Sequence, residues 1–430
     1  MNRPDSRWAR AGRPYTAAVV DGIAAASESL SRGDLESAER LARTALEDDE
    51  SLSGRLVLAQ ALAWQGRGRD ADAVLDEVDP ATLSEPDLLT WALPRAANQF
   101  WMLDEPERAT AFLRSTRGHV TSGPAVATVD ALLGTFAMNA GSPVRAMELA
   151  DEVLASADAD EQAVGWAAAA AALCNARMGV FADVDALALR AIDAGHPGLL
   201  RFTSALGQTT ALVLAGDLDG AQRLAEDLAA GADAGPSAAI AALLVADVLL
   251  WRGDPSGAAA LLEDAAAALA PTGYSWGPLA WMLLAQALAQ LGRIADAGRM
   301  LGRAEARHGL KSMLFAPELA LAKAWTSAAR RDAPGAVNAA REAARAAERG
   351  GQSAVALRAL LDAVRLGDTR AGDGIARLEM DCVVASFALD YARALTAGDR
   401  AGLVAASEVF AGIGMAGVAA DAARQAEAVR

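Results

Sequence analysis

Few side chains in this sequence are spaced for catalysis or metal binding. The three histidines, His119, His196 and His308, lie far apart, whereas a zinc site gathers several nitrogen or sulfur donors. Lys311 and Lys323, the only lysines, lack the glycine-rich turn with which a P-loop cradles phosphates. The chain also lacks the Gly-x-Ser-x-Gly elbow of a nucleophilic serine. We therefore predict no catalytic residue, no metal and no cofactor, and keep an enzyme with a site inside the fold only as an alternative.

A different set of side chains suits binding, because it combines tryptophans with amides and single charges. An indole ring offers flat apolar area with one donor, which suits a peptide, a sugar or a small amphipathic effector. The set consists of Gln60, Trp64, Asn98, Trp101, Asn139, Arg177, Asp247, Trp251, Gln286 and Trp325. The alternative is that these tryptophans fill gaps between packed helices.

These residues share a position relative to a turn that recurs along the chain. Its copies are Gly33, Gly66, Asp104, Gly141, Gly179, Gly216, Gly253, Gly292, Arg331, Gly367 and Gly398, spaced by 31 to 39 residues. Each candidate side chain stands two, three or six residues before a turn, so we expect the set to share one face. A period of this length indicates stacked helical hairpins. The predicted fold is all-α, a right-handed superhelical solenoid of about eleven hairpins over residues 15–425.

The residues around each turn define how the two helices of a hairpin pack. A small residue follows the turn by five positions, as Ala258 and Ala297 do, and we place it where the helices cross closely. Overpacking there should cost about 1–3 kcal/mol, so Ala258→Leu or Ala297→Leu should destabilise the array. Asp104 and Arg331 replace the turn glycine, and we expect the backbone to differ at both.

Composition restricts the partners and the compartment. The net charge is −16, which argues against nucleic-acid binding by this chain. The uncharged stretch 265–292 is divided by prolines and glycines, and the remainder, residues 279–291, is too short to span a bilayer. Cys174 and Cys382 stand among apolar residues, as in a reduced, cytoplasmic protein. Residues 1–14 resemble a flexible basic tail rather than a signal peptide.

The spacing of small residue, Leu, Gly and Ala around each turn resembles the tetratricopeptide repeat. The match is degenerate, since the aromatic that usually follows the glycine is missing and the helix-ending proline is mostly absent. The resemblance implies that the first helices of the hairpins line a concave face, where the candidate set would lie.

Three segments, residues 31–42, 63–72 and 392–410, also resemble the sensor region of MalT-like, LuxR-type bacterial transcription regulators. In that family an ATPase module precedes the repeats and a helix-turn-helix domain follows them, and neither is present here. The resemblance implies the sensing half of a regulator whose ATPase and DNA-binding domains lie on other chains, or a truncated regulator.

The function expected from these observations is that of a non-catalytic scaffold or sensor module. It would bind a protein or peptide partner, or a small effector, on its concave face, in bacterial transcription regulation or signalling. The last hairpin carries Val409, Phe410, Ile413 and Met415 without an evident cover. We expect these to be exposed, which makes that hairpin a candidate contact between two copies of the chain.

Overall fold

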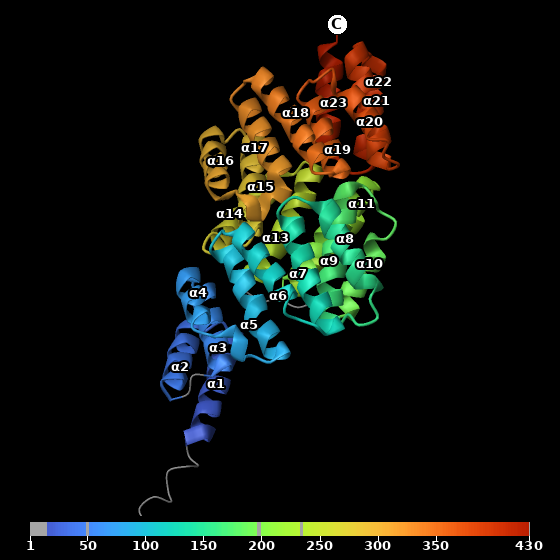
Figure 1. The fold of residues 1–430 in the computed structure, drawn as a ribbon. Helices are drawn as coiled ribbons and strands as arrows, with labels where there is room; N and C mark the ends of the chain where they lie inside the picture. The colour runs from blue at the N-terminus through green and yellow to red at the C-terminus, as the bar shows by residue number, and fades with distance from the viewer. Residues whose placement is uncertain (1–14, 49–50, 196–198, 233–234, 430) are drawn as a thin grey trace, which may run out of the picture. The chain divides into compact units, whose positions relative to one another are not determined.

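The computed structural model describes residues 15–48, 51–195, 199–232 and 235–429, and all regular structure in these ranges is helical (Figure 1). The all-α prediction is confirmed. The helices form two compact units, Met1–Val120 with Pro271–Gly273, and Thr121–Ala270 with Tyr274–Arg430. The predicted basic tail, residues 1–14, lies outside the described residues.

The first unit contains three hairpins. Its helices are α1 (Tyr15–Ser31), α2 (Leu35–Asp48), α3 (Leu52–Trp64), α4 (Gly68–Asp76), α5 (Glu85–Ala97) and α6 (Pro106–Arg117), with a short 3₁₀ turn at Pro80–Thr82 and a π-helical turn, η2, at Asn98–Met102. Leu58, Leu62, Leu75 and Trp91 form its core.

The second unit contains eight hairpins and one additional helix. The first four hairpins are α7 (Gly123–Asn139) with α8 (Pro143–Ala155), α9 (Glu161–Met178) with α10 (Val184–Asp193), α11 (Leu200–Leu214) with α12 (Leu218–Ala230), and α13 (Pro236–Arg252) with α14 (Pro255–Leu269). The remaining helices are α15 (Trp276–Gln290), α16 (Ile294–Arg307), α17 (Ala316–Ala329), α18 (Ala333–Arg349), α19 (Ser353–Arg365), α20 (Ala371–Arg377), α21 (Val383–Ala397), α22 (Arg400–Gly412) and α23 (Ala416–Ala428), with a 3₁₀ segment η3 at Leu310–Phe315. The two units together hold the eleven hairpins that the period predicts.

Every predicted turn residue adopts a left-handed backbone conformation. The expectation that the backbone would differ at Asp104 and Arg331 was wrong for φ, since their angles of 60° and 63° match those of the glycines. It was right for the helix before Asp104, which ends in the π-helical turn η2, so that Glu105 donates to the Gln99 carbonyl six residues back. At Arg331 the turn is closed by the same two backbone hydrogen bonds as at Gly292. Arg331 donates to Ala328 and Asp332 to Ser327, as Gly292 donates to Ala289 and Arg293 to Leu288. The side chains of Asp104 and Arg331 point to solvent, so the conformation costs only the intrinsic penalty of about 1–2 kcal/mol.

Local sequence explains why the second helix starts directly after the turn. An aspartate often follows the turn residue, and its carboxylate accepts a hydrogen bond from an amide of the new helix, as Asp217, Asp254 and Asp332 do. This is the preferred N-cap arrangement. The small residue five positions after the turn is fully buried at Ala258 and Ala297, as its predicted place between crossing helices requires.

The end of the array differs from its prediction. Phe410 and Met415 are buried, Ile413 is half-buried and only Val409 is substantially exposed. The reason is α23, which follows a further left-handed turn at Gly414 and packs on α22. Phe410 also contacts the rings of Phe387 and Tyr391.

Candidate functional site

The ten candidate side chains divide between the two units. Gln60, Trp64, Asn98 and Trp101 belong to the first unit, and Asn139, Arg177, Asp247, Trp251, Gln286 and Trp325 to the second. We call the candidate side chains of each unit its inner face, and the two sets differ in how their side chains are engaged.

The second unit closes on itself so that inner helices meet inner helices. Helix α9 packs on α19, α11 on α21 and α13 on α23. The turns between paired helices take part in this closure: the Gly179 turn lies against Met380, and the Gly253 turn lies against the backbone of Gly417. Helices α19, α21 and α23, from the end of the unit, thus pack against the first helices of its earlier hairpins.

Arg177 on α9 is buried and makes contacts across this space. Its guanidinium donates to Gln352 Oε1 at 2.5 Å and to the Leu314 carbonyl at 2.8 Å, and pairs with Glu318 Oε1 at 2.8 Å. It also lies over the Phe315 ring, 5.2 Å from its centroid. Each of these contacts joins α9 to a segment more than 130 residues further along the chain.

Asp247 and Trp251 lie one turn apart on α13 and are covered by one side chain of α19. Arg358 pairs with Asp247 at 2.8 Å and lies over the Trp251 ring, 4.7 Å from its centroid. Burial alone would lower the pKa of the Arg358 guanidinium, but Asp247 and Asp362 outweigh burial and raise it. Arg358 is therefore a mostly buried, charged group, with 15% of its side chain exposed, paired with a carboxylate.

A second contact of the same kind joins α19 to α17, two hairpins after α13. Arg365 lies over the Trp325 ring at 4.6 Å, and pairs with Asp362 at 2.8 Å and with Asp421 of α23 at 2.7 Å. The Trp325 indole donates to Asp362 Oδ2 at 3.1 Å. Both guanidiniums of α19 thus combine an indole face with a carboxylate.

The space that remains beside these contacts is small. One cavity, lined by Arg177, Thr210, Asp247, Trp251, Glu318 and Arg358 together with leucines, has a volume of about 40 Å³. A second, beside Gln286, Gln290 and Trp325, measures about 10 Å³. Glu318 Oε2 is buried and has no hydrogen-bond partner among the described residues. These cavities have room for water molecules, and a water would satisfy such an oxygen.

Three other members of the set are buried amides that bond to neighbouring segments. The Asn139 amide donates to the Thr135 carbonyl, and its oxygen accepts from the Ser275 hydroxyl at 2.8 Å. Asn98 in the first unit is buried and donates to the Gly68 carbonyl at 2.8 Å. Gln286, also buried, lies 3.5 Å from the Glu318 carbonyl.

The inner face of the first unit is open at α3. Trp64 is 47% exposed, and Gln60, one turn earlier on the same helix, is exposed as well. Over the described chain, no arginine lies above the Trp64 ring and the Gln60 side chain makes no hydrogen bond. Trp101 is half-buried and packs edge-on against Phe100, 5.0 Å between ring centroids.

Sequence reasoning missed the partners that α19 supplies. Arg365 stands two residues before the Gly367 turn, the position at which Trp64 and Trp251 were selected, so the same rule would have found it. No comparable signal marks Arg358 or Glu318, since their contacts join segments far apart in sequence. A groove of about 400 Å³ between α21 and α22, lined by Phe387, Ala394, Ala406 and Val409, was also not foreseen.

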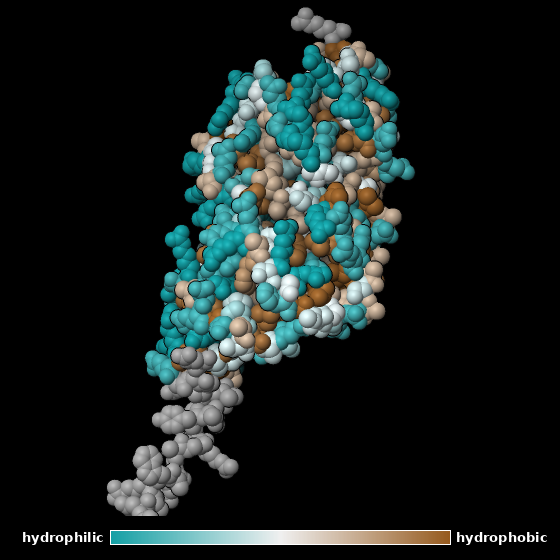
Figure 2. All heavy atoms as spheres, in the orientation of Figure 1, coloured by the Kyte–Doolittle hydropathy of each residue, from teal (hydrophilic) through white to brown (hydrophobic). Residues whose placement is uncertain are grey.

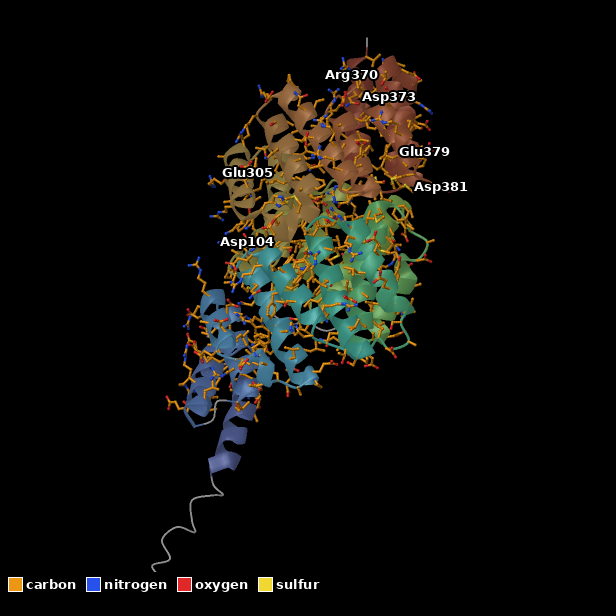
Figure 3. The ribbon with its side chains drawn as sticks, in the orientation of Figure 1. Asp104, Glu305, Arg370, Asp373, Glu379 and Asp381 are labelled. Atoms are coloured by element: carbon orange, nitrogen blue, oxygen red, sulfur yellow. The ribbon has the colours of Figure 1, made fainter. Side chains whose placement is uncertain are left out.

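Acidic side chains and thiols in the described part of the chain do not form a metal site. Arg370 and Asp373 lie at one end of α20, and Glu379 and Asp381 lie beyond its other end (Figure 3). No set of three or more His, Cys, Asp or Glu among the described residues could hold a metal ion. Burial raises the pKa of Cys174 to about 12, so its thiol is protonated at neutral pH. No helix in the described ranges is long and apolar enough to cross a membrane.

Large apolar side chains on the outer surface of the second unit are few. Val144 on α8 and Leu189 and Ile192 on α10 are each more than half exposed. Figure 2 shows apolar side chains in small groups among polar ones on the visible face. Scattered exposure of this kind is normal for a protein surface.

No model of a known protein family matches the chain, and neither does any curated protein. Solved structures with a similar course include a tetratricopeptide repeat protein from Parabacteroides merdae, with a TM-score of 0.40 and 15% identity over 59% of this chain and 93% of that one. The APC/C hetero-tetramer Cut9-Hcn1 gives a TM-score of 0.33 and 15% identity over 97% of this chain and 96% of that one. A Rap protein complexed with Competence and Sporulation Factor gives a TM-score of 0.43 and 14% identity over 89% of this chain and 98% of that one. At these scores the fold assignment depends on the helices of the chain itself, an all-α array of hairpins of the kind that the tetratricopeptide resemblance implies.

Proposed function

We propose that this chain is a non-catalytic scaffold that binds a protein or peptide partner on the inner face of its first unit. The observation that carries the proposal is the exposure of Trp64 and Gln60 on α3. A half-exposed indole next to a free amide offers both apolar area and hydrogen bonds to a partner, and tryptophan is among the residues that most often dominate binding energy.

For the candidate residues of the second unit we propose a structural role. Arg177, Asp247, Trp251 and Trp325 already have partners on other helices of the same unit. A cavity of about 40 Å³ between them is far below the roughly 300 Å³ that a small-molecule site needs. A small effector would have to displace α19, so a partner on the first unit is favoured over an internal effector.

The cellular context of this scaffold is a separate proposal. The resemblance of three sequence segments to the sensor region of LuxR-type regulators favours bacterial transcription regulation or signalling, with ATPase and DNA-binding modules on partner chains. The net charge of −16 supports a role without direct DNA contact. A homodimer through the last hairpins would use the open groove between α21 and α22.

Site-specific photocrosslinking tests the proposed face. A photoreactive amino acid replaces Trp64 in one variant and Ile192, which is similarly exposed on α10, in a control. We expect a specific adduct only from position 64, and the partner identified from it should bind Trp64→Ala at least tenfold more weakly than the unaltered chain. Equal adducts from both positions, or unchanged affinity of Trp64→Ala, would argue against this face.

A further inference from the structure

The chain contains an internal counterpart of the open face on α3. Gln60 and Trp64 stand six and two residues before the Gly66 turn, and Asp247 and Trp251 stand six and two residues before the Gly253 turn. The two pairs therefore occupy equivalent places on the first helices of their hairpins. Ala59 and Ala246, seven residues before each turn, are both buried against the second helix, so the register is the same.

In the second unit, this place is filled by an arginine on a helix. Arg358 of α19 lies over the Trp251 ring at 4.7 Å, and donates to Asp247 at 2.8 Å. The same helix makes a related contact seven residues later, where Arg365 lies over Trp325 at 4.6 Å and pairs with Asp362. Trp325 stands six rather than two residues before its turn. In both contacts, an arginine of α19 that is paired with a carboxylate covers a tryptophan of the inner face.

The equivalent place in the first unit lacks that cover. Trp64 is 47% exposed, whereas Trp251, at the equivalent place, is only partly exposed beneath Arg358. Gln60 replaces Asp247, and its amide oxygen is an acceptor that a guanidinium can use. Residues 15–120 contain 19 Asp and Glu, 10 Arg and no Lys, and this negative balance favours approach of a cationic partner segment.

We infer that the inner face of α3 binds a helical segment of a partner protein through an arginine that stacks on Trp64 and donates to Gln60. The inference deepens the proposed function and rests on it, because it names the chemistry of the partner. Arginine is specified over lysine because its planar guanidinium stacks on an aromatic ring while its edge still donates hydrogen bonds. The partner helix would stand to α3 as α19 stands to α13.

The sequence of α19 supplies a direct probe. A fluorescein-labelled peptide with the sequence of residues 350–367, added to the full chain, is followed by fluorescence anisotropy. We expect binding that weakens about 5- to 30-fold when Trp64→Ala is introduced in the protein, the range that a stacked guanidinium contributes. The peptide variant Arg358→Ala should lose as much, Arg358→Lys should bind with intermediate affinity, and Gln60→Ala should weaken binding less than Trp64→Ala.

Two controls separate this contact from other modes of binding. Leu189→Ala, on an exposed outer helix, should leave the affinity unchanged. If the peptide instead displaced the chain's own α19 and took its place, binding would not depend on Trp64. That result would overturn the inference. So would the absence of peptide binding, or equal binding of the Arg358→Ala peptide. If position 64 nevertheless crosslinks to a protein partner, the proposed function survives and only the arginine-helix chemistry is refuted.

Discussion

The turn at Gly253 offers the sharpest prediction about how the second unit is held together. Its φ of 83° is left-handed, and a Cβ placed there would lie 2.3 Å from the amide nitrogen of Gly417 at the start of α23. Gly292 is the matched control, because its φ is 72° but a Cβ there meets nothing within 4 Å. Alanine at either site carries the left-handed penalty of about 1–2 kcal/mol.

Only Gly253→Ala adds a collision between backbones, which cannot be relieved by rotating a side chain. Overpacking costs typically about 1–3 kcal/mol, so Gly253→Ala should destabilise by roughly 2–5 kcal/mol in total. Urea unfolding followed by circular dichroism measures both variants, and hydrogen exchange should show faster exchange in α23 only for Gly253→Ala. Equal losses in the two variants would refute the proposed closure of the turn on α23.

Gly417→Ala isolates the collision from the backbone penalty. Gly417 lies in the first turn of α23 and has no left-handed φ, so alanine should by itself stabilise there by up to about 1 kcal/mol. Its Cβ, however, would lie 2.8 Å from the Gly253 Cα. We expect a net loss of stability, and a gain would show that α23 does not dock on the Gly253 turn.

Further predictions concern packing, backbone, charge and thiol chemistry. Ala258→Leu should cost about 1–3 kcal/mol in thermal unfolding because the site is fully buried between crossing helices. Arg331→Gly should raise the melting temperature, since it relieves a left-handed strain of about 1–2 kcal/mol. Arg358→Ala should cost about 3–5 kcal/mol in urea unfolding because it leaves the Asp247 carboxylate uncompensated, and adding Asp247→Asn should recover part of that loss. Cys174 should resist alkylation in the folded chain at pH 8.5, where its raised pKa keeps it protonated, and should react in 8 M urea; rapid reaction of the folded chain would contradict its burial.

The hairpins could be predicted from the sequence because each depends on contacts within one repeat. The turn residue, the small residue five positions later and the aspartate cap lie within about ten residues of each other. Even so, glycine proved to be a sign of the turn rather than a requirement, because Asp104 and Arg331 adopt the same left-handed φ, and at Arg331 the closing backbone hydrogen bonds are those of the glycine turns.

The inner faces could be predicted only in part. The number of residues before the turn correctly grouped Asp247 with Trp251 on one helix face. The residue that contacts both, Arg358, lies more than 100 residues further along the chain. Whether an inner face is open or filled depends on the small rotation that each hairpin adds to the stack. That rotation accumulates over several repeats and leaves no local pattern in the sequence, so Trp64 and Trp251 were equivalent in sequence although one is exposed and the other covered.

The burial of each tryptophan is the most direct test of this difference. Hydroxyl-radical footprinting of the full chain, read by mass spectrometry, gives the oxidation rate of Trp64, Trp251 and Trp325 in one experiment. We predict rapid oxidation of Trp64, slow oxidation of Trp251 and Trp325, and a selective increase at Trp251 in the Arg358→Ala variant. Oxidation of Trp251 as fast as that of Trp64 in the unaltered chain would contradict the conclusion that α19 fills the inner face of the second unit.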